Sequence, residues 1–209
     1  MGRIISDFED YYDKYFEDNI KEEYAGEEIS FIRKRCYDNK VMELKALKDI
    51  GISVINIEPI NRIFNVQNTD LIVVYTDISG HNGNGKLVLD FNEANMLYSN
   101  RLGSKLSKQY DGYTYKFLQI GIRKFWLVIK NDQYLRESEL VGIQEFEKGY
   151  TKGINIPIFS IDYTLVDGVQ TAVDFNTTQN LSKLNFKTYM SEEEVCLEIY
   201  NSLKIRRVS

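Results

Sequence analysis

The chain has 209 residues, with 26 Lys and Arg against 31 Asp and Glu, so its formal net charge is −5 at pH 7. A chain of this length predicts one domain or two tightly packed lobes, with a core large enough to need no covalent staples. The acidic balance argues against a protein that coats nucleic acid, because that role depends on clustered Lys and Arg.

The chain offers little for thiol or histidine chemistry. His81 is the single histidine, and the two cysteines, Cys36 and Cys196, lack the spacing of metal ligands. Reduced thiols in the cytoplasm are therefore expected. No signal peptide follows Met1 and no apolar run has transmembrane length, so we expect a soluble protein without a membrane partner.

The first expected element is an amphipathic helix over residues 6–24. Ser6 and Glu9 have the spacing of a capping box, and aromatic residues recur behind them at helical intervals. Turn signals and β-branched residues divide the next part of the chain. The expected elements there are a strand at 29–33, a helix at 41–50 closed by Gly51, and a strand at 52–57.

A glycine-rich hairpin is predicted in the middle of the chain. Strands at 70–76 and 86–91 flank a tip rich in Gly and Asn. The elements expected after it are a helix at 92–107, paired strands at 113–120 and 123–129, and a short helical turn at 144–149. Near the end of the chain, Ser191 and Glu194 form a second capping box and predict a helix that buries Val195 and Ile199.

Two carboxylates and an amide on neighbouring strands are the most informative polar residues. Asp162 precedes an apolar hairpin, and Asp174 and Asn176 lie two apart on the returning strand, so both point to one face. Hard oxygen ligands of this kind hold Mg²⁺ against nucleotide phosphates. A two-residue turn at Asp167 and Gly168 would separate Asp162 from Asp174, so the metal interpretation predicts a bulge there. The alternative is a set of polar residues on a solvated strand face.

The hairpin tip has two interpretations. Gly80, Gly83 and Gly85, followed by Lys86, make a loop whose backbone amides could fold over phosphates. The loop joins strand to strand, so it is neither a Walker loop nor a dinucleotide fingerprint. Gly and Asn at these positions are equally the ordinary chemistry of a hairpin turn.

Three further cations are candidates for phosphate contacts. Lys116 and Arg123 lie on or beside predicted strands, and Arg136 lies in a polar loop. Such side chains supply point-charge or bidentate contacts to phosphate oxygens. Exposed salt bridges explain each of them equally well.

The order of these pieces resembles the nucleotide-binding core of the ATP-grasp superfamily over approximately residues 68–206. The segments PIFSID at 157–162 and VDFN at 173–176 look like the paired strands that carry the metal ligands of that family. The resemblance implies an α+β fold of two α+β lobes with mainly antiparallel sheets. It also implies a division into an N-terminal α/β segment, 1–67, and a nucleotide-binding core, 68–209.

By this resemblance the protein would use ATP and Mg²⁺ as a carboxylate–amine ligase, through an acyl phosphate, on a small-molecule or peptide carboxylate. The implied metal ligands are Asp162, Asp174 and Asn176, and Arg136 would contact the transferred phosphate. The implied lid contains Gly80, Gly83 and Gly85. Where the family has a lysine this chain has Tyr75, so Lys86, Lys116 or Arg123 would have to supply that charge.

Departures from the family pattern support a competing hypothesis. Besides Tyr75, an acidic ribose ligand is not evident near residues 116–119, and Thr177 replaces the usual proline after Asn176. The alternative is a catalytically inactive binding or interaction protein. Residues 1–40 resemble small proteins of tailed bacteriophages, which would make a host component the partner and the host cytoplasm the location.

Overall fold

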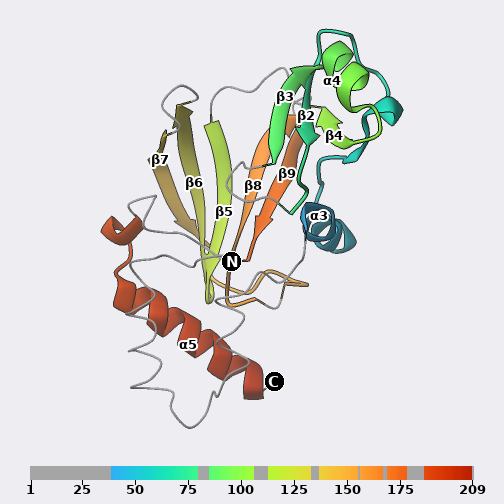
Figure 1. The fold of residues 1–209 in the computed structure, drawn as a ribbon. Coiled ribbons are helices and arrows are strands. Elements are labelled where there is room, and N and C mark those ends of the chain that lie inside the picture. The colour runs from blue at the N-terminus through green and yellow to red at the C-terminus, as the bar shows by residue number, and fades with distance from the viewer. Residues whose placement is uncertain are drawn as a thin grey trace. The chain divides into compact units, whose positions relative to one another are not determined.

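A computed structural model describes residues 39–79, 85–105, 113–132, 137–154, 156–166, 169–177 and 186–208 (Figure 1). The chain divides into two compact units that share the hairpin at 158–176. Within the described ranges, the first unit holds 113–162 and 176–208, and the second holds 39–105 and 163–175. The helix predicted at 6–24 and the strand predicted at 29–33 lie outside the described residues.

The second unit begins with helix α3 (Lys40–Asp49), within one residue of its predicted bounds. The Asn39 side chain accepts a hydrogen bond from the Met42 N–H and caps its first turn. Gly51, at φ +88°, ends the helix as expected, because glycine adopts this left-handed conformation without a Cβ penalty.

The strand predicted at 52–57 is reduced to a single parallel bridge. Val54 pairs with Ala172, and the Ile55 N–H donates to the Ala172 carbonyl at 2.9 Å. β-Branched residues favour extended backbone, but a ladder also needs a partner strand. Only one residue of this segment finds such a partner before the two-residue strand β1 begins at Glu58.

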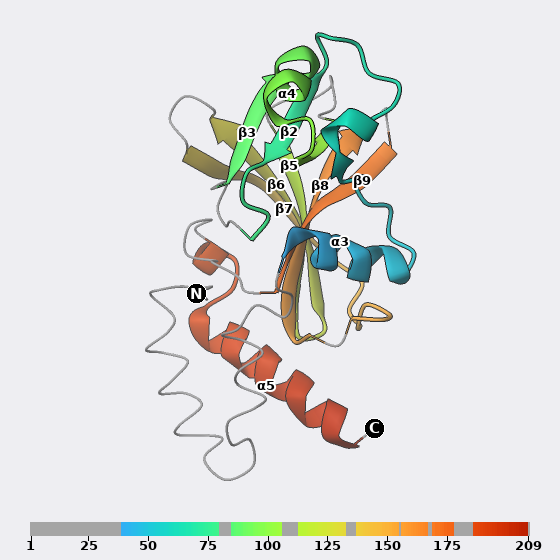
Figure 2. The ribbon, with the colours of Figure 1, turned by 45° about the vertical axis from the view of Figure 1, so that its right-hand side comes forward.

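The sheet of the second unit has four antiparallel strands in the order β1-β4-β2-β3 among the described residues. Helix α4 (Phe91–Tyr98) packs on it (Figure 2). Its Ala94 is buried with Ile60, Ile72 and Val74. The strands are β1 (Glu58–Pro59), β2 (Leu71–Tyr75), β3 (Lys86–Asp90) and β4 (Leu102–Lys105).

The prediction of a helix over 92–107 is wrong for residues 99–105, and residues 106 and 107 lie outside the described part of the chain. Residues 102–105 form β4, which pairs with β2 and contains Gly103. A Cβ on Gly103 would lie 2.8 Å from Ile60 Cγ1, so this glycine lets the strand approach the short helix η1 (Ile60–Arg62). Helical periodicity continues through the segment, but the pairing partner that decides its conformation is distant in the chain.

The other sheet is built mainly in the first unit, in the order β7-β6-β5-β8-β9 among the described residues. The short helical turn predicted at 144–149 is wrong, because residues up to Phe146 pair with β6. Phe146 packs there against Trp126 and Phe117. The strands are β5 (Tyr113–Ile120), β6 (Arg123–Asp132), β7 (Glu137–Phe146), β8 (Ile158–Val166) and β9 (Val169–Asn176).

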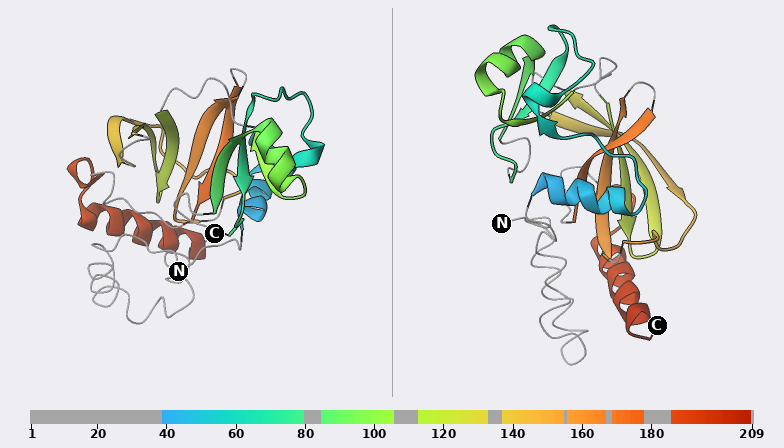
Figure 3. Two further views of the ribbon diagram at one scale, coloured as in Figure 1. Left: turned by 45° about the horizontal axis from the view of Figure 1, so that its top comes forward. Right: turned by 90° about the vertical axis from the view of Figure 1, so that its right-hand side faces the viewer.

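Helix α5 (Glu192–Val208) completes the first unit, with the short helix η3 (Phe186–Thr188) before it (Figure 3). The predicted capping box is confirmed: the Ser191 N–H donates to Glu194 Oε2 at 2.7 Å, and the Glu194 N–H donates to Ser191 Oγ at 3.2 Å. The helix packs on β5 and β6. The core there contains Leu118, Ile120, Phe125, Leu127, Phe186, Val195, Cys196 and Ile199.

Replacing Gly121 with alanine is expected to lower the free energy of unfolding by about 2–4 kcal/mol. Gly121 has φ +58°, and a Cβ there would lie 2.5 Å from the Glu198 carbonyl oxygen of α5. Gly142→Ala is the matched control, because its Cβ would meet Val128 Cβ at an ordinary 3.5 Å. Urea unfolding of both variants checks the prediction, and equal losses would contradict it.

Candidate functional site

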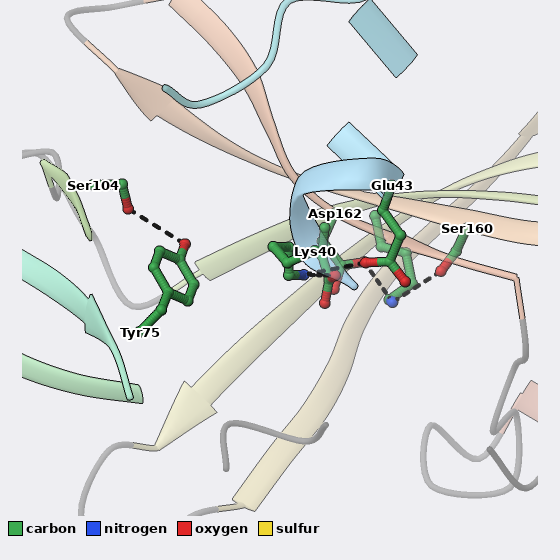
Figure 4. Close-up of polar contacts among 8 residues, drawn as sticks. Lys40, Glu43, Tyr75, Ser104, Ser160 and Asp162 are labelled. Atoms are coloured by element: carbon green, nitrogen blue, oxygen red, sulfur yellow. Dashed lines mark hydrogen bonds and ion pairs between the residues drawn. The ribbon is translucent and has the colours of Figure 1, made fainter. Parts of the chain in front are cut away.

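In the first unit, a lysine on β5 holds the predicted metal ligand of β8. Lys116 Nζ lies 2.5 Å from Asp162 Oδ1 and donates to Ser160 Oγ at 3.1 Å (Figure 4). Ser160 and Asp162 lie two apart on β8, so both side chains point toward the same face of the sheet. The Lys116 and Asp162 side chains are only 13% and 20% exposed. The ion pair is therefore largely shielded from water.

In the second unit, a lysine at the start of α3 holds the predicted metal ligand of β9. Lys40 contacts Asp174 Oδ1, and its Nζ lies 3.8 Å from Glu43 Oε2 one helical turn away (Figure 4). The Lys40 and Glu43 side chains are 5% and 3% exposed, and that of Asp174 is 28% exposed. The bridge between Val54 and Ala172 fixes the chain that follows α3 alongside β9, two residues before Asp174.

Each predicted metal-binding carboxylate thus faces a lysine ammonium. Burial of an ion pair has a large desolvation cost, which the attraction between partners offsets only when both are present. The Lys116–Asp162 pair is formally neutral, and the group of Lys40, Glu43 and Asp174 carries one net negative charge. Both carboxylates are therefore placed to hold positive charge.

The oxygen donors predicted on β8 and β9 are of the chemical type that Mg²⁺ uses when it is bound together with phosphates. Mg²⁺ takes one or two carboxylates and keeps its other positions for phosphate oxygens and water. Across the described ranges, no group of three or more His, Cys, Asp or Glu side chains is arranged to hold a metal ion. Carboxylate and amide oxygens are donors that suit this phosphate-linked type, and Asn176 ends β9 as a half-buried residue.

The bulge predicted between β8 and β9 stays a prediction. β8 ends at Val166 and β9 begins at Val169. The two residues between them, Asp167 and Gly168, lie outside the described part of the chain.

The glycine-rich tip is described only where it joins the strands. Gly85 has φ +75°, and its carbonyl accepts hydrogen bonds from the Thr76 and Asp77 N–H groups. A Cβ at this position would lie 2.6 Å from Asp77 Cβ, so the hairpin requires glycine here. Lys86 opens β3 opposite Tyr75. Gly80 and Gly83 lie outside the described residues.

Arg123 is engaged in a salt bridge within the first unit. Its guanidinium donates to both carboxylate oxygens of Glu145, at 2.8 and 2.7 Å, and lies 5.3 Å from the Phe125 ring centroid. The hydrogen bond to Glu145 raises the pKa of Arg123, and the same bond lowers the pKa of Glu145. A phosphate contact by Arg123, which stays a prediction, would have to replace this bidentate pair.

Tyr75 is the residue that, by the sequence resemblance, stands where ATP-grasp proteins have a lysine. It is buried on β2, and its hydroxyl lies 3.3 Å from Ser104 Oγ on β4. Burial raises the pKa of the Tyr75 phenol, while the contact with Ser104 acts in the opposite direction. The side chain therefore contributes no charge near neutral pH.

Sequence reasoning did not identify Lys40, Glu43 or Ser160. Lys40 and Glu43 belong to a helix whose presence was predicted, but ion pairing with a residue on β9 leaves no local pattern. Ser160 has the spacing of two from Asp162, a signal that was present in the strand alternation. Arg136, the proposed catalytic residue, lies outside the described residues.

Comparison of the sequence with known families and with curated proteins gives no match. No known family profile matches the chain, and no curated protein matches it. No sequence relative therefore supports the resemblance of residues 1–40 to phage proteins.

Solved ATP-grasp ligases match the structure. A RiPP-associated ATP-grasp ligase from Chryseobacterium gregarium, in complex with ADP and a leader and core peptide, has TM-score 0.52 and 13% identity, covering 85% of this chain and 62% of that one. The ATP-grasp ligase PsnB, complexed with precursor peptide PsnA2 and AMPPNP, has TM-score 0.50 and 14% identity, covering 79% of this chain and 58% of that one. D-alanine–D-alanine ligase from Bacillus anthracis has TM-score 0.42 and 14% identity, covering 81% and 68%.

The matches to PsnB and to the Chryseobacterium gregarium ligase agree with the expected fold class. The chain is α+β, ATP-grasp-like, with mainly antiparallel sheets. It spans 62% of the length of the Chryseobacterium gregarium ligase and 58% of the length of PsnB. Over the described ranges, no helix is both long and apolar enough to cross a membrane.

Proposed function

We propose that the protein is a carboxylate–amine ligase that consumes ATP with Mg²⁺. The observation that carries the proposal is the placement of a lysine ammonium against each of two carboxylates, Asp162 and Asp174, in an ATP-grasp-like fold. Phosphoryl transfer depends mostly on positioning and charge neutralisation, so it needs no histidine or cysteine nucleophile. A chain with a single histidine is suited to this chemistry.

The proposed reaction has two steps. A carboxylate oxygen of the substrate attacks the γ-phosphorus of ATP, so a P–O bond to ADP breaks and an acyl phosphate forms. The nitrogen of an amine then attacks the acyl carbon, inorganic phosphate leaves, and the amine loses a proton. An amide or peptide bond results, with ADP and phosphate as the other products.

Asp162, Asp174 and Asn176 are the proposed ligands of Mg²⁺, which would neutralise phosphate charge. The lysine beside Asp162, Lys116, is placed to follow that charge onto phosphate oxygens. Arg136 is the proposed contact of the transferred phosphate. The proposed nucleotide contacts are Gly80, Gly83, Gly85, Lys86 and Arg123.

A peptide carboxylate is the substrate class best supported. Two solved ligases that match this chain, with TM-scores of 0.50 and 0.52, are complexes with a precursor peptide and with a leader and core peptide, respectively. An acidic side chain or a C-terminus of a peptide has the carboxylate that the reaction requires. A small-molecule carboxylate is the other candidate.

Tyr75 favours a second candidate function. A neutral, buried phenol bonded to Ser104 contributes no positive charge for phosphate. Loss of one phosphate-neutralising cation weakens binding by about 2–5 kcal/mol in a desolvated site. The alternative is therefore a catalytically inactive protein of the same fold that binds a ligand or partner, for which the phage hypothesis supplies a host component.

Thermal unfolding with Mg-ATP tests the proposal. At a nucleotide concentration 100 times Kd, binding to the folded state adds about 2.7 kcal/mol to the free energy of unfolding, which raises Tm by several degrees. Asp174→Ala with Asn176→Ala should abolish this rise. Asp49→Ala with Asn92→Ala, an exposed acid and amide, is the matched control and should retain it.

The outcomes separate the candidates. No rise in Tm at millimolar Mg-ATP refutes the ligase proposal. A rise without release of ADP in the presence of candidate carboxylates and amines supports the inactive alternative instead. ADP release that depends on Asp174 and Asn176 supports the ligase.

A further inference from the structure

Lys40 lies between two carboxylates, and only one of them is a proposed metal ligand. Its ammonium contacts Asp174 Oδ1 and lies 3.8 Å from Glu43 Oε2 (Figure 4). Lys40 and Glu43 belong to the same turn of α3, and their side chains are 5% and 3% exposed. Glu43 has no part in the proposed metal site.

We propose that Lys40 is an internal competitor for the cation position on Asp174, and that Glu43 receives its ammonium when a divalent cation binds. This inference rests on the proposed function, because it concerns the same metal site. Lys40 and Glu43 are positioning residues in this proposal. The site would thereby discriminate against free divalent cations.

The electrostatic argument starts from burial. A divalent cation on Asp174 and the Lys40 ammonium repel each other strongly at a few ångström in a poorly solvated region. Lys40 cannot simply move into water at low cost, because its side chain is almost completely buried. The Lys40 ammonium needs a second anion that it can reach by side-chain rotation alone.

Glu43 supplies that anion. Its carboxylate is one helical turn away, and an i,i+3 pair on a helix needs no backbone movement to form. Transfer of the ammonium from Asp174 to Glu43 keeps every buried charge opposite a partner. The proton count of the three groups does not change, so no acid or base is required.

Removal of the competitor should increase cation affinity. In Lys40→Met with Glu43→Gln, two neutral side chains of similar size replace the pair, and Asp174 remains. We expect the affinity for Mn²⁺ alone to rise by about tenfold or more, measured by the electron paramagnetic resonance signal of free Mn²⁺. Adding Asp174→Asn should remove the gain.

Glu43→Gln alone tests the receiving role. Lys40 then keeps Asp174 but has lost the Glu43 carboxylate, so Mn²⁺ affinity should fall by about tenfold relative to the parent protein. Lys45→Met, which removes an exposed lysine from the same helix, is the matched control for long-range charge and should change little at physiological salt.

Several results would overturn the inference. They are an unchanged or lower Mn²⁺ affinity in the double variant, a gain that survives Asp174→Asn, and an unchanged affinity in Glu43→Gln. Absence of bound Mn²⁺ in all variants also overturns it. Because nucleotide is absent from these titrations, they can succeed even if Mg-ATP fails to stabilise the parent protein, and the two failures remain distinguishable.

Discussion

Lys40→Met is expected to lower the free energy of unfolding by about 3–5 kcal/mol, because it removes the ammonium from beside two carboxylates. Glu43 is 3% exposed and Asp174 is 28% exposed, so at least one charge loses its nearby cation away from bulk water. The loss comes from the desolvated carboxylates more than from the missing attraction. Urea unfolding at pH 7, with unchanged m-value, is the measurement.

A double variant distinguishes this cause from simple loss of packing. Lys40→Met with Glu43→Gln should recover part of the stability, because a neutral amide replaces the carboxylate that lost its partner. The coupling energy of the cycle should be about 1–3 kcal/mol. Lys48→Met, an exposed change in the same helix, should stay within about 0.5 kcal/mol. Equal effects of Lys40→Met and Lys48→Met would show that the buried pair does not stabilise the fold.

Elements with local signals were predictable from the sequence. The capping box at Ser191 and Glu194 begins α5, and Asn39 and Gly51 bound α3, because helix ends depend on nearby polar groups and on glycine. The β5–β6 hairpin, with Gly121 at its turn, was equally visible. The order of such elements also predicted the ATP-grasp-like fold.

The failures share a physical cause. Pairing with a strand elsewhere in the chain determines the conformation of residues 102–105 and 144–146. The segment at 52–57 has only a single bridge and therefore forms no strand. Pairing energy decides such short segments over intrinsic propensity. Local periodicity therefore gave a helix where the structure has β4.

The candidate site shows the same division. Period-two alternation within one strand placed Asp174 and Asn176 on one face. Asp162, on the neighbouring strand, joined them only through a predicted bulge and the family resemblance. The lysines that face the carboxylates come from β5 and α3, and nothing in the residues around Lys40 indicates its partner on β9. Charge pairing between distant segments becomes visible only when the fold is known.

Asp162→Asn is expected to change the binding of Mg-nucleotide and metal-free nucleotide in opposite directions. If Asp162 holds Mg²⁺, its replacement should weaken binding of Mg-AMPPNP by about 10–100-fold. In the same variant Lys116 loses its carboxylate partner, 2.5 Å away, and keeps Ser160. Its ammonium then becomes a better partner for phosphate, so AMPPNP with EDTA should bind a few-fold more tightly.

This difference in sign separates a metal ligand from a residue that only supports the fold. If Asp162 only supports the fold, Asp162→Asn should weaken the binding of both forms of the nucleotide and should lower Tm. Calorimetric titration of each form makes the comparison, and Glu139→Gln, an exposed acid on β7, is the matched control. If Asp162→Asn weakens metal-free and Mg-bound nucleotide by the same factor, Asp162 is not a metal ligand. In that case the Lys116–Asp162 pair serves mainly to hold β5 and β8 together.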